Sequence, residues 1–100
     1  TNKVVVGNIK GGSSISLALH EYGHAVQHNL MTSSQQARLA DNHARLYPKL
    51  PKYLQQGSPR SKAGMEELFA EGFATVFKSH KLAVKRYGQD FVDLVNEIGM

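Results

Sequence analysis

The chain has 100 residues, 41% of them hydrophobic, and a formal net charge of +4 at pH 7. This length and composition suit a single domain over residues 1–100, and the start at Thr1 leads us to expect a fragment or processed piece of a longer chain. The absence of cysteine excludes disulfides and cysteine-ligated zinc, so a metal site must use histidine, glutamate or aspartate.

Two classes of partner are not expected from the sequence. It has no run of roughly 18–20 apolar residues, so we expect no membrane span. Four basic residues gather in one segment that also contains proline, glycine and serine: Lys49, Lys52, Arg60 and Lys62. This segment lacks the aromatic interleaving of a single-strand binder, so we do not expect nucleic-acid binding.

The first part of the chain predicts a strand and a helix. Lys3 to Asn8 contains a run of three valines, which is typical of a short strand. Two glycines and two serines follow, and Ser13 or Ser14 can cap a helix. The residues from Ile15 to about Leu30 suit a helix, which presents on adjoining turns Leu17, His20, Glu21, His24 and His28.

Three further helices are predicted. The second runs from Ser34 to Tyr47, with a capping box of Ser33 and Gln36, and Pro48 ends it. Pro48 to Lys62 is expected to be a loop, because it holds three prolines and a glycine. The third helix is expected from about Ala63 to Leu82, and its apolar set is Met65, Leu68, Phe69, Phe73, Val76 and Phe77.

A last short helix is expected after an interruption at Gly88, with Asp90 as a possible cap. It is marked by four apolar residues, Phe91, Leu94, Val95 and Ile98. The predicted fold class is therefore mainly α (α+β), with one strand before the first of four helices.

The sequence His20-Glu21-Tyr22-Gly23-His24 has the pattern H-E-x-x-H inside the first predicted helix. Histidines four residues apart lie on one helix face and can share one ion, and neutral imidazoles are good zinc ligands. Glu21 stands where it can take a proton from a metal-bound water. The pattern therefore predicts a hydrolytic zinc site with Glu21 as its general base.

A hydrolytic zinc usually takes three protein ligands, so a third must come from elsewhere in the chain. The available candidates are Glu66, Glu67, Glu71, His28, His43 and His80. Glu67 and Glu71 are four apart and share a face, so one can ligate while the other accepts the N–H of a ligating histidine. Amphipathic phase alone instead favours Glu66 as the inward residue. Gly72 in the same helix either allows this helix to press close against the first helix or is simply tolerated there.

The segment Glu67-Leu68-Phe69-Ala70-Glu71-Gly72-Phe73-Ala74, about forty residues after His-Glu-Tyr-Gly-His-Ala-Val, resembles the second motif of gluzincin metallopeptidases. In particular it is similar to the catalytic domains related to anthrax lethal factor and the bacterial Pro-Pro endopeptidases. The resemblance covers roughly Val4 to Lys78. It implies a zincin-like fold, Glu67 as the third zinc ligand, Glu71 as the supporting carboxylate and Glu21 as the general base.

The chain departs from that family at one position. The family usually has a tyrosine seven residues before the ligand glutamate, where it stabilises the oxyanion, and Arg60 stands there in this sequence. The guanidinium of Arg60 can donate to an oxyanion, or Tyr53 can reach the site from a rearranged loop.

The resulting expectation is a zinc-dependent endopeptidase that cleaves a peptide or protein substrate and is secreted or toxin-associated. The alternative is a metal-stabilised binding module with weak or no turnover. A basic helical interaction domain with an accidental motif is the third possibility.

Overall fold

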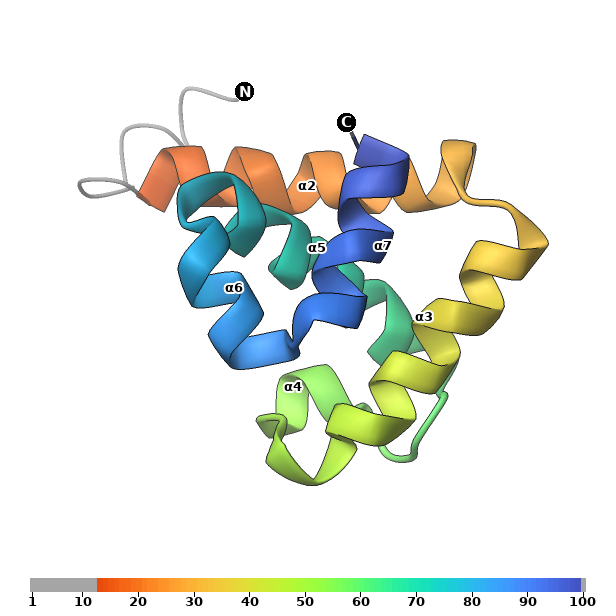
Figure 1. The fold of residues 1–100 in the computed structure, drawn as a ribbon. Helices are drawn as coiled ribbons and strands as arrows, with labels where there is room; N and C mark the ends of the chain where they lie inside the picture. Colours follow the sequence, from red (N-terminus) through yellow and green to blue (C-terminus); the bar gives the residue numbers. More distant parts are fainter. Residues whose placement is uncertain (1–12, 100) are drawn as a thin grey trace, which may run out of the picture.

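The computed structural model describes residues 13–99, and the elements within this range are helical (Figure 1). The helices are α2 (Ser13–Leu30), α3 (Ser33–Leu46), the 3-10 helix η1 (Tyr47–Lys49), α4 (Lys52–Gln55), α5 (Lys62–Lys78), α6 (His80–Tyr87) and α7 (Gln89–Gly99). The prediction of a mainly α fold is confirmed for these residues. The strand predicted over Lys3 to Asn8 lies outside the described residues.

Helix α5 is the central element, because it packs against α2, α3, α4, α6 and α7. Three of its apolar residues, Leu68, Phe69 and Phe73, are fully buried. They join α7, whose buried residues are Phe91, Val92, Leu94 and Val95, in one hydrophobic core. Phe77 was expected on the same buried stripe but is 48% exposed. The burial of α5 fixes the backbone from which its side chains point towards α2.

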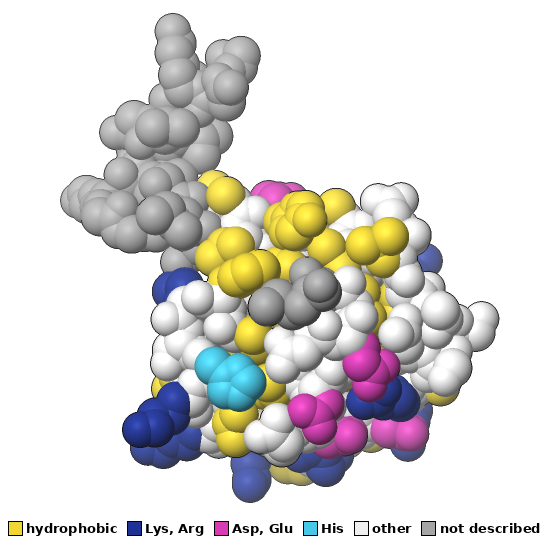
Figure 2. Space-filling model, turned by 45° about the horizontal axis from the view of Figure 1, so that its top comes forward, with side chains coloured by type: hydrophobic (Ala, Val, Ile, Leu, Met, Phe, Trp, Pro, Cys, Tyr) yellow, Lys and Arg dark blue, Asp and Glu magenta, His cyan; other side chains and the backbone are white. Residues whose placement is uncertain are grey.

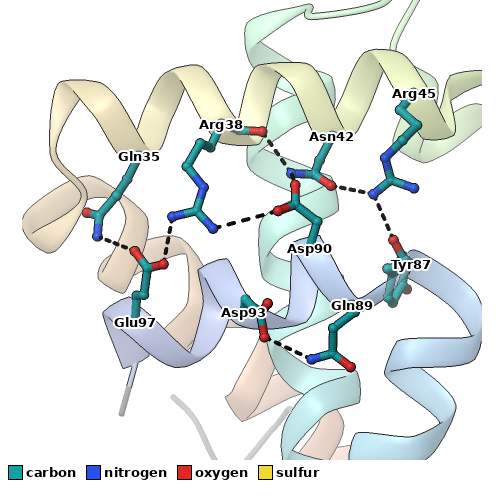
Figure 3. A network of polar contacts seen from close by, with 9 residues as sticks. All are labelled: Gln35, Arg38, Asn42, Arg45, Tyr87, Gln89, Asp90, Asp93 and Glu97. Carbon is teal, nitrogen blue, oxygen red and sulfur yellow. Dashed lines mark hydrogen bonds and ion pairs between the residues drawn. The ribbon is translucent and has the colours of Figure 1, made fainter.

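A polar network joins α3 to α7 on one side of the core (Figure 3). Arg38 donates to Glu97 at 2.7 Å, and Asn42 donates to Asp90 at 3.1 Å. The hydrogen bond between Arg38 and Glu97 raises the pKa of the arginine and lowers the pKa of the glutamate. The network links α3 to α7 at more than one position along both helices.

Several predicted helix boundaries are wrong by a residue or more. The capping box of α3 uses Thr32 and Gln35, one residue before the predicted pair. Helix α7 begins at Gln89, so Asp90 lies in its first turn and does not cap it. The predicted loop from Pro48 to Lys62 contains η1 and α4.

The predicted third helix is divided at Ser79. This residue has extended backbone angles, and its hydroxyl accepts a hydrogen bond from the Leu82 N–H, which caps α6. Serine hydroxyls compete with the helical backbone for such donors, which explains the break. His80 therefore lies at the start of α6 and not in the last turn of the preceding helix.

The connection from α4 to α5 is held by His43, which is fully buried on α3. Its Nε2 donates to the Leu54 carbonyl at 2.8 Å, and its Nδ1 accepts from the Arg60 N–H at 2.9 Å. Gln56 and Arg60 both have left-handed backbone angles, with φ of 50° and 66°. The imidazole therefore holds a strained connection in place, and α4 with it.

Several large hydrophobic side chains are exposed to solvent. Figure 2 shows hydrophobic side chains gathered along the upper part of one face, with acidic and basic side chains below them. The exposed large hydrophobic residues include three on α2, and the set is Leu17, Tyr22, Leu30, Tyr53, Phe77 and Leu82. None of the helices described between residues 13 and 99 combines the length and the apolar character needed to cross a bilayer.

Candidate metal centre

The site forms where α2 passes close to α5, and Gly23 permits this close approach. A β carbon at Gly23 would lie 2.8 Å from the Ala70 α carbon and 3.2 Å from the Phe73 β carbon. Gly23 lies between His20 and His24 in the chain and is buried. The two helices can therefore approach at the level of the histidines only because this residue has no side chain.

The prediction that Gly72 allows this approach is wrong. A β carbon at Gly72 would lie 2.2 Å from Cε2 of Phe91, so this glycine makes room for the core ring on α7. The role of Gly23 was not predicted, although the sequence indicates that this glycine is unusual. A glycine in the interior of a helix costs about 1 kcal/mol relative to alanine, and Gly23 sits inside the H-E-x-x-H pattern itself.

His20, His24 and Glu67 form the one group of three potential metal-ligating side chains found within residues 13–99. One ligand atom from each lies within 4.8 Å of the others. Glu67 Oε1 is 3.2 Å from His20 Nε2, and Glu67 Oε2 is 3.6 Å from His24 Nε2. The structure thus brings together the three residues predicted as ligands, two from α2 and one from α5.

The two separations from Glu67 are close to those between ligands of a tetrahedral metal ion. Nitrogen and oxygen ligands at about 2.0–2.2 Å from zinc lie roughly 3.3–3.6 Å from one another. Glu67 is close to this separation from both histidines, through Oε1 at 3.2 Å from His20 and through Oε2 at 3.6 Å from His24. The side chains of His20, His24 and Glu67 are 20%, 27% and 34% exposed, so an ion can enter from solvent.

The contacts of His20 give a second argument for a cation. Its Nδ1 is 3.0 Å from Glu71 Oε1, while its Nε2 faces Glu67 Oε1. A neutral imidazole carries only one N–H and can donate to only one of these carboxylates. The remaining nitrogen then directs a lone pair at an oxygen 3.2 Å away, which is unfavourable unless a second proton or a metal ion lies between them. A divalent ion would also balance the two carboxylate charges.

Glu71 and Tyr53 surround the metal-ligating group on one side. With Nδ1–H of His20 donated to Glu71, its Nε2 is left as the ligand nitrogen, as is common for metal-binding histidines. The Tyr53 hydroxyl donates to Glu71 Oε2 at 3.0 Å. Burial, with the Glu71 hydrogen bond second, raises the pKa of Tyr53 to about 12. Tyr53, Glu71 and His20 therefore form a continuous chain of hydrogen bonds.

Arg60 lies elsewhere, although the sequence places it where the resembled family has its tyrosine. Its side chain is 58% exposed and pairs with Asp41 on α3 at 3.0 Å. Asp41 was not among the predicted site residues, because a single aspartate on a helix does not indicate its partner. Of the two residues predicted to assist an oxyanion, only Tyr53 contacts the group around His20.

The other third-ligand candidates are not part of the metal-ligating group. Glu66 and His28 line a separate cavity of about 370 Å³. His43 is occupied by its two backbone partners, and His80 begins α6. Glu21 is exposed on α2, and within the described part of the chain it makes no hydrogen bond or ion pair.

Comparison with known proteins does not identify the chain: no protein-family model, no curated protein and no solved structure matches it. The geometry of the described residues is therefore the basis for a functional assignment.

Proposed function

We propose that this chain is a zinc-dependent endopeptidase of the gluzincin kind, with His20, His24 and Glu67 as its metal ligands. The observation that carries the proposal is the paired contact of Glu67 with both histidines of the H-E-x-x-H pattern, at 3.2 Å and 3.6 Å. Nitrogen and carboxylate donors of this kind are typical of catalytic zinc. When bound, zinc would supply Lewis acidity towards water and towards the carbonyl of the scissile bond.

His20 and Glu71 act as an orienting pair in this proposal. Glu71 Oε1 accepts the Nδ1–H of His20, which fixes the tautomer and turns Nε2 towards Glu67. The hydroxyl of Tyr53 in turn holds the other oxygen of Glu71. The ligand geometry is thereby set before substrate arrives, which lowers the reorganisation needed for catalysis.

Glu21 is the residue that transfers the proton of the attacking water. Its carboxylate has no competing partner among the described residues, and it directly follows His20 in the chain. It can take a proton from the attacking water at a carboxylate oxygen and pass it to the leaving amine.

Tyr53 is the better of the two candidates for stabilising the carbonyl oxygen of the scissile bond. The pKa of its hydroxyl is about 12, so the hydroxyl is protonated at neutral pH and can donate a hydrogen bond. Half of its side chain is exposed, and the phenol can turn from Glu71 towards a substrate. Arg60 is held by Asp41 instead.

The variant Glu21→Gln tests the proposal, because it separates zinc binding from peptide cleavage. We expect this isosteric change to leave zinc binding unaltered and to lower the cleavage rate of a peptide library by at least about a hundredfold, the lower range for a general base. Lys81→Gln, an exposed change on α6, is the control and should cleave like wild type.

The alternative is a metal-stabilised binding module, and the ion pair of Arg60 with Asp41 is the observation that favours it. A wild-type protein that binds one zinc but cleaves no member of the library would select this alternative. Secretion and an association with toxins stay predictions.

A further inference from the structure

A second cavity lies beside Tyr53 and is lined by residues of η1, of α4 and of the C-terminal end of α6. Its volume is about 210 Å³, and apolar parts of its wall come from Leu46, Leu50 and Leu54. An apolar cavity of about 150 Å³ is enough to hold benzene. This space therefore accommodates one apolar side chain of ordinary size, and it is too small for a drug-sized ligand.

The charges around this cavity have one sign. Lys49 from η1 and Arg86 from α6 both contribute to its lining, whereas no aspartate or glutamate among the described residues does. Within residues 13–99 neither cation makes a hydrogen bond or an ion pair. Elsewhere on this molecule Arg38 and Arg60 are paired with carboxylates. Two unpaired positive charges at one apolar cavity are complementary to an anion attached to an apolar group.

Tyr53 connects the cavity to the metal centre. It contributes to the cavity lining, and its hydroxyl donates to Glu71, the carboxylate that holds His20. A ligand in the cavity therefore lies against a side chain that is only two hydrogen bonds from a proposed metal ligand. This position suits part of a peptide whose scissile bond is at the metal.

We propose that this cavity binds an apolar side chain of the substrate that has a carboxylate beside it, with Lys49 and Arg86 holding the carboxylate. The carboxylate belongs either to the chain end or to an adjacent acidic residue, and the chemistry is the same for both. The substrate part of this inference rests on the proposed peptidase function, whereas the binding part does not.

Binding is tested on the metal-free protein, so that its result is independent of catalysis. The probes are N-acetyl-L-leucine, its neutral amide N-acetyl-L-leucinamide, and an N-acetylated Leu-Asp dipeptide amide, each titrated by NMR. We expect the two carboxylates to shift the resonances of Leu46 and Leu54 and to bind about three- to tenfold more tightly than the neutral amide, as two partly exposed charge pairs allow. The tighter of the two carboxylates identifies the source of the charge. Equal affinity for all three probes, or no shift at these leucines, would overturn the proposal.

The double variant Lys49→Gln/Arg86→Gln tests the two cations. It should reduce the affinity for both carboxylates to that for the neutral amide. Lys81→Gln/Lys85→Gln removes the same net charge from α6 outside the cavity lining, and it should retain the wild-type preference. Equal losses in the two double variants would mean that net charge, and not this cavity, determines binding.

Cleavage distinguishes a failure of this inference from a failure of the proposed function. If wild type prefers peptides with a Leu-Asp pair over Leu-Lys peptides and Lys49→Gln/Arg86→Gln loses that preference, the cavity is a substrate subsite. If the preference survives in the variant, the subsite is wrong although the peptidase is real. If nothing is cleaved while the carboxylate probes still bind, the peptidase proposal fails and the cavity stands as a ligand site.

Discussion

Gly23 of α2 lies directly against Ala70 of α5, and a β carbon on the glycine would come within 2.8 Å of the Ala70 α carbon. The contact is between backbones, so a rotamer change cannot relieve it. His20 and His24 flank this glycine on α2, and Glu67 lies one turn before Ala70 on α5. The contact therefore sets how closely the ligands from the two helices can approach each other.

The variant Gly23→Ala is expected to separate the helices at this point. Alanine gains roughly 1 kcal/mol over glycine in a helix interior, and the clash should outweigh this gain. We expect a net loss of about 1–3 kcal/mol in the free energy of unfolding. Urea unfolding measures the loss, and a zinc titration should show weaker binding. Ala25→Gly, on the exposed side of α2, is the control: it should lose about 1 kcal/mol of stability with unchanged zinc affinity. A Gly23→Ala protein at least as stable as wild type would show that α2 and α5 are not in such close contact.

The hydrogen bond from Tyr53 to Glu71 is expected to be visible in the titration of the tyrosine. In the metal-free protein burial and this bond raise the pKa of Tyr53 to about 12 from its ordinary value of 10. The folded state thus holds the phenolic proton more tightly than the unfolded state. The resulting stabilisation is complete below pH 10 and is lost as the pH rises towards 12.

Glu71→Gln should lower the pKa of Tyr53 towards 10 without reaching it, because burial, the larger cause, is unchanged. The difference in tyrosinate absorbance between each protein and its Tyr53→Phe counterpart isolates this one residue among the four tyrosines. The same midpoint with glutamate and glutamine at position 71 would contradict the hydrogen bond.

His43 is expected to be the most important histidine for folding, although it ligates nothing. His43→Ala removes a fully buried ring and leaves the Leu54 carbonyl and the Arg60 N–H without partners. We expect a loss of about 2–4 kcal/mol in the free energy of unfolding. His28→Ala, at an exposed position, should change it by no more than about 0.5 kcal/mol. A His43→Ala protein that also stays within this limit would contradict the role given to the buried imidazole.

The parts of the fold that the sequence predicted well depend on local periodicity. The positions of α2, α3 and α7 were predicted from residue spacing, caps and a terminating proline, and they agree with the structure to within about two residues. The break at Ser79 was missed, because a serine inside an apolar pattern gives no sign of whether its hydroxyl will cap the next turn. Helix α4 was missed because its four residues lie among prolines.

The metal-ligating group was predicted from two short motifs, and the structure supplies the distances between them. Amphipathic phase favoured Glu66, yet Glu67 faces the histidines, because α2 approaches α5 on the side fixed by Gly23 and Ala70. The placement of Tyr53 and Arg60 was left open by the sequence. It depends on backbone contacts of a buried histidine seventeen residues before Arg60, which no local pattern encodes.

The central claim is that His20, His24 and Glu67 hold one zinc ion, and a zinc titration against a competing chromophoric chelator tests it most directly. The two variants to compare are Glu67→Ala and Glu66→Ala, because these neighbours on α5 are both partly buried and only Glu67 belongs to the metal-ligating group. We predict one equivalent of zinc in wild type and in Glu66→Ala, and a loss of at least about tenfold in affinity in Glu67→Ala. A wild-type protein without stoichiometric zinc, or a greater loss in Glu66→Ala than in Glu67→Ala, would contradict the account.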